Sequence, residues 1–138
     1  MPRFSGWAVR TALIYLLFGF TAGGLMLAHR GMPFAGWVWR LLAAHVEWLL
    51  VGWAAQLALG VAYWILPRLP GGVRGREPLV WSAYALLNLG LLAVALSGLM
   101  NCVWCTLAGR TGELIGALLF AAAVWPRVRQ VWKPTRSH

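Results

Sequence analysis

Long stretches without a charged side chain constrain this sequence more than any other feature. Residues 11–28, 48–67 and 79–109 are uncharged runs of 18, 20 and 31 residues. The hydrocarbon core of a bilayer is about 30 Å thick, and a helix needs roughly 20 residues to cross it. A fourth run, residues 114–126, has only 13 residues, but Arg127, Arg129 and Lys133 can extend it by snorkelling toward the head groups. The sequence therefore predicts four transmembrane helices.

The composition points to lipid as the solvent of this chain. Of its 138 residues, 61% are hydrophobic and 11% are charged, whereas a soluble domain carries roughly 25% charged residues. We expect one all-α membrane domain, a four-helix bundle connected up-down-up-down. The expected helices cover approximately residues 7–29, 34–66, 78–100 and 111–131.

The basic residues are distributed unevenly between the two predicted sides. Nine of the twelve precede the first helix, join the second to the third, or follow the fourth. Cytoplasmic loops carry such an excess of Lys and Arg, so we expect both termini in the cytoplasm and a multi-pass protein of the plasma membrane, or cell inner membrane. The net charge of +9 then reflects topology and attraction to anionic lipid, and no nucleic-acid partner is expected.

Small residues in the first helix offer a place for close helix packing. Gly19 and Gly23 form a G-x-x-x-G step, with Gly24 adjacent. Such steps let two membrane helices approach closely. We therefore expect a helix contact at this step.

His45 is the leading candidate for a ligand, because ionisable groups inside membrane segments are costly and often functional. At 100° per residue, Gly52, Gln56 and Tyr63 share its helix face. An imidazole followed by a glycine suits a heme, which needs a neutral imidazole on iron and an apolar slot. The alternative is a histidine that is hydrogen-bonded within the bundle. His29, on the same outer side, is the candidate second ligand, or else a solvated interfacial histidine.

Glu47 lies about 160° from His45 on the same helix, so the two side chains should face different neighbours. We expect Glu47 to pair with an arginine near the outer interface, for which Arg30, Arg40 and Arg110 are available. The functional alternative is a carboxylate that handles protons or contacts a quinone.

Cys102 and Cys105 form a C-x-x-C motif between the third and fourth helices. Covalent heme attachment would need a following His, but residue 106 is Thr. A disulfide, a pair of free thiols, and copper binding with the help of Met100 remain open.

The second predicted helix resembles a known family. Residues 44–53 (AHVEWLLVGW) and 60–68 (GVAYWILPR) are similar to the second transmembrane helix of the catalytic subunit of heme-copper oxidases, and especially of nitric oxide reductases. Shorter likenesses to the first and third helices of that family occur at residues 15–24 and 81–90. The resemblance covers nearly the whole chain, but only about the first third of that subunit.

The resemblance implies that His45 is an axial ligand of a low-spin heme b. The family's second low-spin ligand, its second heme and its copper ligands come from later helices, which have no counterpart in this sequence. The other axial ligand would then be His29, the same His45 of a second copy in a homodimer, or a residue of a partner.

These features favour a small membrane b-type heme protein that serves electron transfer, heme handling or gas sensing. We expect no catalytic activity from the chain alone. A hydrolytic enzyme is not expected because there is no hydrolase triad, phosphate loop or carboxylate pair, and oxygen or nitric oxide reduction is not expected because the family's later helices have no counterpart. The alternative is a cofactor-free accessory subunit or assembly factor of a respiratory complex. A third interpretation is an outer-side copper handler that uses Cys102 and Cys105.

Overall fold

The computed structural model of this chain describes residues 1–69, 72 and 74–131. All regular structure in this part is helical. Four of its helical segments are long and apolar enough to cross a membrane. They are α1 (Arg3–Gly31), a composite second span (Val38–Ile65), α4 (Glu77–Met100) and α5 (Val103–Val131). The predicted all-helical fold is therefore confirmed, together with its membrane-length helices.

The second span consists of several kinds of helix. A short 3₁₀ turn, η1 (Val38–Arg40), leads into α2 (Leu41–Glu47), then into the π-helix η2 (Trp48–Ala55) and finally into α3 (Gln56–Ile65). A π-helix bonds each amide five residues back, so it turns less per residue than an α-helix. Angles computed at 100° per residue therefore do not hold beyond Glu47.

Glycines of α1 allow close packing against the second span. A Cβ added at Gly19 would lie 2.5 Å from the Cδ2 of Leu49, and one added at Gly23 would lie 2.7 Å from the Cε1 of His45. The predicted helix contact at this G-x-x-x-G step is therefore confirmed. It places the imidazole of His45 directly on the backbone of α1.

A second glycine seam joins α4 to α5. A Cβ at Gly90 would lie 2.6 Å from the carbonyl oxygen of Gly109, and a Cβ at Gly109 would lie 2.7 Å from the carbonyl oxygen of Gly90. The tight turn between the two helices has Asn101 in the left-handed conformation, with φ of 53°, which asparagine tolerates at helix C-termini. The two helices therefore form a close hairpin.

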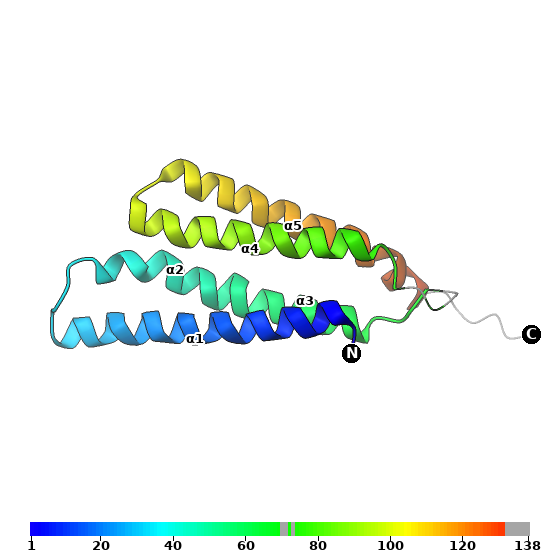
Figure 1. Cartoon of the computed structure of the whole chain (residues 1–138), viewed down its shortest axis with the longest axis horizontal. Coiled ribbons are helices and arrows are strands. Elements are labelled where there is room, and N and C mark those ends of the chain that lie inside the picture. The colour runs from blue at the N-terminus through cyan, green and yellow to red at the C-terminus, as the bar shows by residue number, and fades with distance from the viewer. Residues whose placement is uncertain (70–71, 73, 132–138) are drawn as a thin grey trace, which may run out of the picture.

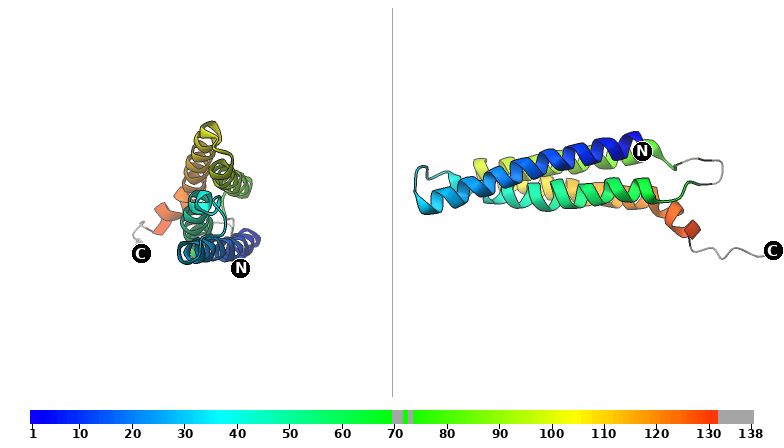
Figure 2. Two further views of the ribbon diagram at one scale, coloured as in Figure 1. Left: turned by 90° about the vertical axis from the view of Figure 1, so that its left-hand side faces the viewer. Right: turned by 90° about the horizontal axis from the view of Figure 1, so that it is seen from below.

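Figure 1 shows how the two helical pairs lie, with α1 beside α2 and α3, and α4 beside α5. The turns that follow α1 and α4 lie at one end of the molecule, and the N-terminus lies at the other. Figure 2 shows the two pairs packed side by side, with their helices running roughly along the long axis of the molecule. Near the N-terminal end, a core cluster that includes Phe4, Tyr63, Val80 and Phe120 draws on all the spans.

The fourth helix is longer than the sequence predicted. α5 begins at Val103 rather than near residue 111, and it includes Arg110 and Glu113. The prediction failed because it counted uncharged residues only. A charged residue can lie inside a membrane helix when it pairs with an opposite charge. Arg110 pairs with Glu47 of α2, and Glu113 pairs with Arg110 on its own helix.

Candidate functional site

His45 is held by a hydrogen bond to the backbone of α1. Its Nδ1 lies 2.8 Å from the carbonyl oxygen of Gly19. Since a carbonyl can only accept, Nδ1 carries the hydrogen, and in the neutral ring Nε2 keeps its lone pair. Nε2 has no hydrogen-bond partner among the residues that the structure describes, and the side chain is half-buried. The hydrogen bond to Gly19 therefore holds the imidazole of His45 in a fixed orientation.

The space beside Gly52 is filled by other side chains. A Cβ added there would lie 2.7 Å from the Cγ of Tyr15 and 2.9 Å from the Cδ1 of Leu91. In this bundle the space beside Gly52, where the sequence predicted room for a macrocycle, is occupied by these two side chains. Gly52 instead lets α1 and α4 approach the second span closely.

Gln56 belongs to a buried polar network that joins the spans. Asn88 of α4 donates from Nδ2 to the Oε1 of Gln56 at 3.0 Å, and its Oδ1 accepts from the hydroxyl of Tyr15 at 2.9 Å. The hydroxyls of Thr11 and Tyr84 lie 2.9 Å apart next to it. Because these bonds link α1, α3 and α4, Gln56 has a structural position, and we do not assign it to a cofactor.

His29 caps the loop that follows α1. Its Nδ1 accepts from the backbone amides of Phe34 at 3.2 Å and Ala35 at 3.4 Å, and the edges of the Phe34 and Trp39 rings pack on it. His29 is six residues beyond the Gly23 that His45 contacts, which is about 9 Å along α1. The geometry therefore gives His29 a structural role away from His45.

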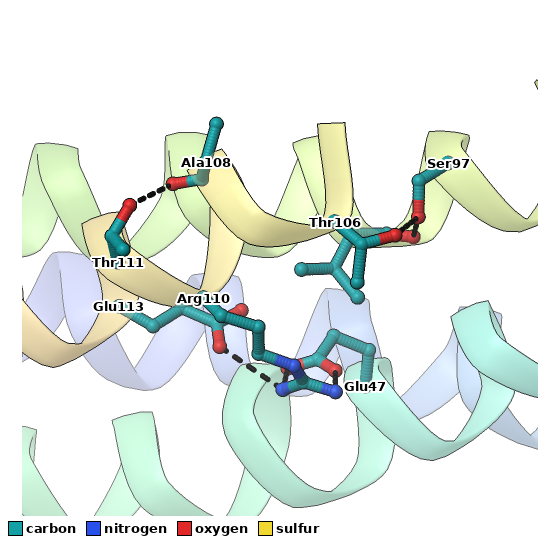
Figure 3. A network of polar contacts seen from close by, with 8 residues as sticks. Glu47, Ser97, Thr106, Ala108, Arg110, Thr111 and Glu113 are labelled. Atoms are coloured by element: carbon teal, nitrogen blue, oxygen red, sulfur yellow. Dashed lines mark hydrogen bonds and ion pairs between the residues drawn. The ribbon is translucent and has the colours of Figure 1, made fainter. Parts of the chain in front are cut away.

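Glu47 forms an ion pair on the opposite side of the second span (Figure 3). Its Oε2 lies 2.8 Å from the Nη2 of Arg110, and its Oε1 accepts from Nη1 at 3.0 Å. Arg110 also donates from Nη1 to the Oε2 of Glu113 at 3.1 Å. Of the three arginines considered from the sequence, Arg110 is thus the partner, and Glu47 and His45 face different helices, as the angle between them predicted.

The charged cluster of Glu47, Arg110 and Glu113 is unusual because its carboxylates are buried and lie well inside the helices. Glu47 is 1% exposed and Glu113 is 9% exposed, and Arg110 and Glu113 lie roughly 10 and 15 Å along α5 from its first residue. In the sequence, both α5 residues lie just before the uncharged run of residues 114–126. The one signal that could have found them is the G-x-x-x-G step at Gly112 and Gly116, which marks α5 as a packed helix.

Arg127 is completely buried near the other end of the bundle. Its Nε donates to the carbonyl of Pro67 at 2.9 Å, and its Nη2 donates to the carbonyls of Tyr63, at 2.9 Å, and Leu66. Its Cζ lies 4.8 Å from the centre of the Tyr63 ring. The expectation that Arg127 snorkels to the head groups is therefore wrong, because it satisfies the last carbonyls of α3. Lys133 lies outside the described residues.

Cys102 and Cys105 are joined by a disulfide at the start of α5, with their Cα atoms 5.3 Å apart. The bridge closes the turn that Asn101 begins. In this oxidised state neither sulfur is a thiolate, which is the form that copper would need.

Among the described residues, no group of three or more His, Cys, Asp and Glu side chains is placed to hold a metal ion. A bare ion would therefore need ligands from elsewhere. A heme needs only axial ligands from protein, because its macrocycle supplies the others.

Comparison of the chain with protein-family models, with characterised proteins and with solved structures gave no match.

Proposed function

We propose that this protein is a membrane b-type heme protein for electron transfer, with His45 as an axial ligand. One observation carries the proposal: the hydrogen bond from His45 Nδ1 to the Gly19 carbonyl. Heme-ligating and metal-ligating histidines commonly donate their other ring nitrogen to such an acceptor, which fixes the tautomer and raises the basicity of the ligating nitrogen. The sequence resemblance to the second helix of heme-copper oxidases supports the same residue.

The surroundings of His45 fit a heme at the surface of one chain. The lipid-facing side chains Leu42 and Val46, on the same helix, are 51% and 41% exposed, and Phe20 on α1 is 66% exposed. They offer apolar surface to a macrocycle outside the packed interior. A bound heme would supply a reversible one-electron change at iron. The chain itself would hold the imidazole in place through Gly19 and Gly23.

The second axial ligand in this proposal is His45 of a second copy. His29 has its Nδ1 lone pair engaged by two amides, so its neutral form carries the hydrogen on Nε2. A two-fold homodimer brings the same residue from each copy to one iron. No catalytic activity is proposed for the chain alone.

We further propose an up-down-up-down arrangement in the plasma or inner membrane with both termini in the cytoplasm. Nine of twelve basic residues support it. The disulfide between Cys102 and Cys105 supports it independently, because disulfides persist on the oxidising side of that membrane.

The test is the visible spectrum of the protein purified from heme-replete cells. We expect a Soret band that shifts on reduction with dithionite, and its loss in His45→Gly. Because that variant also loses the hydrogen bond to Gly19, added imidazole should restore the band if the fold is intact. His29→Ala is the matched control and should keep the band. A colourless wild-type protein, or an unchanged band in His45→Gly, would refute the proposal.

A cofactor-free accessory subunit or assembly factor of a respiratory complex is the second candidate. It is favoured by the filled space at Gly52 and by the internal pairing of Gln56 and Asn88. The same spectrum separates the two candidates, since this one requires a colourless protein that copurifies with respiratory subunits.

A further inference from the structure

A groove in the membrane-spanning region opens between the second span and α5. It has a volume of about 580 Å³, within the range of small-molecule sites. Its walls are aliphatic, and Arg110 and Glu113 lie in its lining. It occupies the side of the second span that faces Glu47, away from His45 and α1.

The polar part of the groove has hydrogen-bonding capacity that the protein does not use. Glu113 Oε1 is buried and has no hydrogen-bond partner among the described residues, and Glu113 itself is more than nine-tenths buried. The side chain of Arg110 is 52% exposed although it is paired with two carboxylates. An acceptor without a partner therefore lies beside a guanidinium that can still donate.

The charged groups beside the groove limit which molecules can bind in it. Two carboxylates repel a fatty acid or a phosphate, and among the described residues no third His, Cys, Asp or Glu side chain is placed to complete a metal site with them. The complement is a neutral, lipid-soluble molecule whose hydroxyl can donate to Glu113 and accept from Arg110.

We propose that this groove binds the head group of a lipid-soluble hydroquinone. The hydroxyl chemistry follows from the groove. The choice of a hydroquinone among neutral hydroxyl-bearing lipids rests on the electron-transfer function proposed above, since that function needs an electron donor and a hydroquinone is a lipid-soluble one. The ring would lie along the apolar wall formed by Val51, Ala55 and Ala58.

Binding is tested with tetramethylhydroquinone under argon, by calorimetric titration of the protein in phosphatidylcholine nanodiscs. Ala58 is exposed and lines the groove, so Ala58→Phe fills it without disturbing the core and should abolish binding. Ala54 is also exposed, one turn earlier and outside the lining, so Ala54→Phe should bind like the wild type. Glu113→Gln should weaken binding about tenfold, because a hydrogen bond to a charged acceptor becomes one to a neutral acceptor.

Equal binding by Ala58→Phe and wild type would overturn the proposal. So would dioctanoylglycerol binding as tightly as the hydroquinone, since the site would then recognise any neutral hydroxyl lipid. The titration does not depend on a Soret band. If the protein is colourless but binds the hydroquinone, the heme proposal is refuted and the groove proposal stands. If the protein has a Soret band but does not bind the hydroquinone, the groove proposal is refuted and the heme proposal stands.

Discussion

The charged side chain of Arg127, which the sequence alone would place at the lipid head groups, lies inside the bundle. Its guanidinium is fully buried and donates to three carbonyls at the end of α3. Tyr63 lies in the last turn of α3, whose carbonyls have no partner within the helix, and Leu66 and Pro67 follow the end of α3. A single side chain from α5 thus caps the end of α3 and fixes the two helices to each other.

Replacement of this side chain should destabilise the protein. Arg127→Met keeps the apolar stem and removes the donors, so we expect the free energy of unfolding to fall by about 2–4 kcal/mol. Arg129 is exposed, and Arg129→Met is the control that should change little. Unfolding in mixed detergent micelles, followed by tryptophan fluorescence, measures both. An equal loss of unfolding free energy in both variants would show that the buried hydrogen bonds of Arg127 add nothing to stability.

At the scale of the element, glycines determine which helices touch. The carbonyls of Gly90 and Gly109 each occupy the position that a side chain on the other glycine would take. Without a hydrophobic driving force between helices in lipid, such close backbone approach supplies the packing. The α4–α5 hairpin depends on this seam.

Gly109→Ala should therefore separate α4 from α5. The added methyl would lie 2.6 Å from the Cγ2 of Val94, and we expect a loss of about 1–3 kcal/mol from overpacking. Gly24 has nothing within 4 Å of an added Cβ. Gly24→Ala should thus be neutral, or stabilising by up to about 1 kcal/mol through helix propensity. Thermal unfolding of both variants in one detergent checks the contrast, and similar melting temperatures would contradict it.

The elements that the sequence predicted well are those defined by a local signal. Uncharged runs located the spans, and Pro67 marked the end of the second within one or two residues of Ile65. The π-helix η2 and the early start of α5 depend on tertiary contacts instead. In the sequence, Arg110 has the position of a residue at the membrane boundary. Only the structure places Glu47, 63 positions earlier, beside it. His45 is a candidate ligand from its residue type and its depth in the helix, whereas the sequence could not predict the Gly19 carbonyl that orients it.

At the scale of the whole molecule, charge and disulfide chemistry make the same prediction about orientation. The basic residues favour a cytoplasmic end that holds the N-terminus and the connection from α3 to α4. The Cys102–Cys105 bridge lies at the opposite end.

Cysteine labelling in intact cells tests this orientation. After mild reduction, a membrane-impermeant maleimide should label Cys102 and Cys105 from outside. In a Cys102→Ser, Cys105→Ser background, Arg76→Cys should be labelled only after the cells are permeabilised. Labelling of Arg76→Cys in intact cells would reverse the proposed topology.

The ion pair between Glu47 and Arg110 also has a consequence for biosynthesis. A ribosome adds roughly 5–20 residues per second, so Glu47 precedes its partner by roughly 3–13 seconds. During that interval the nascent chain holds a carboxylate without its arginine, and insertion of the second span into lipid carries a cost that only the fourth span removes. We expect chains cut short before Arg110 to be cleared by membrane quality control, so that the pair acts as a check on complete synthesis.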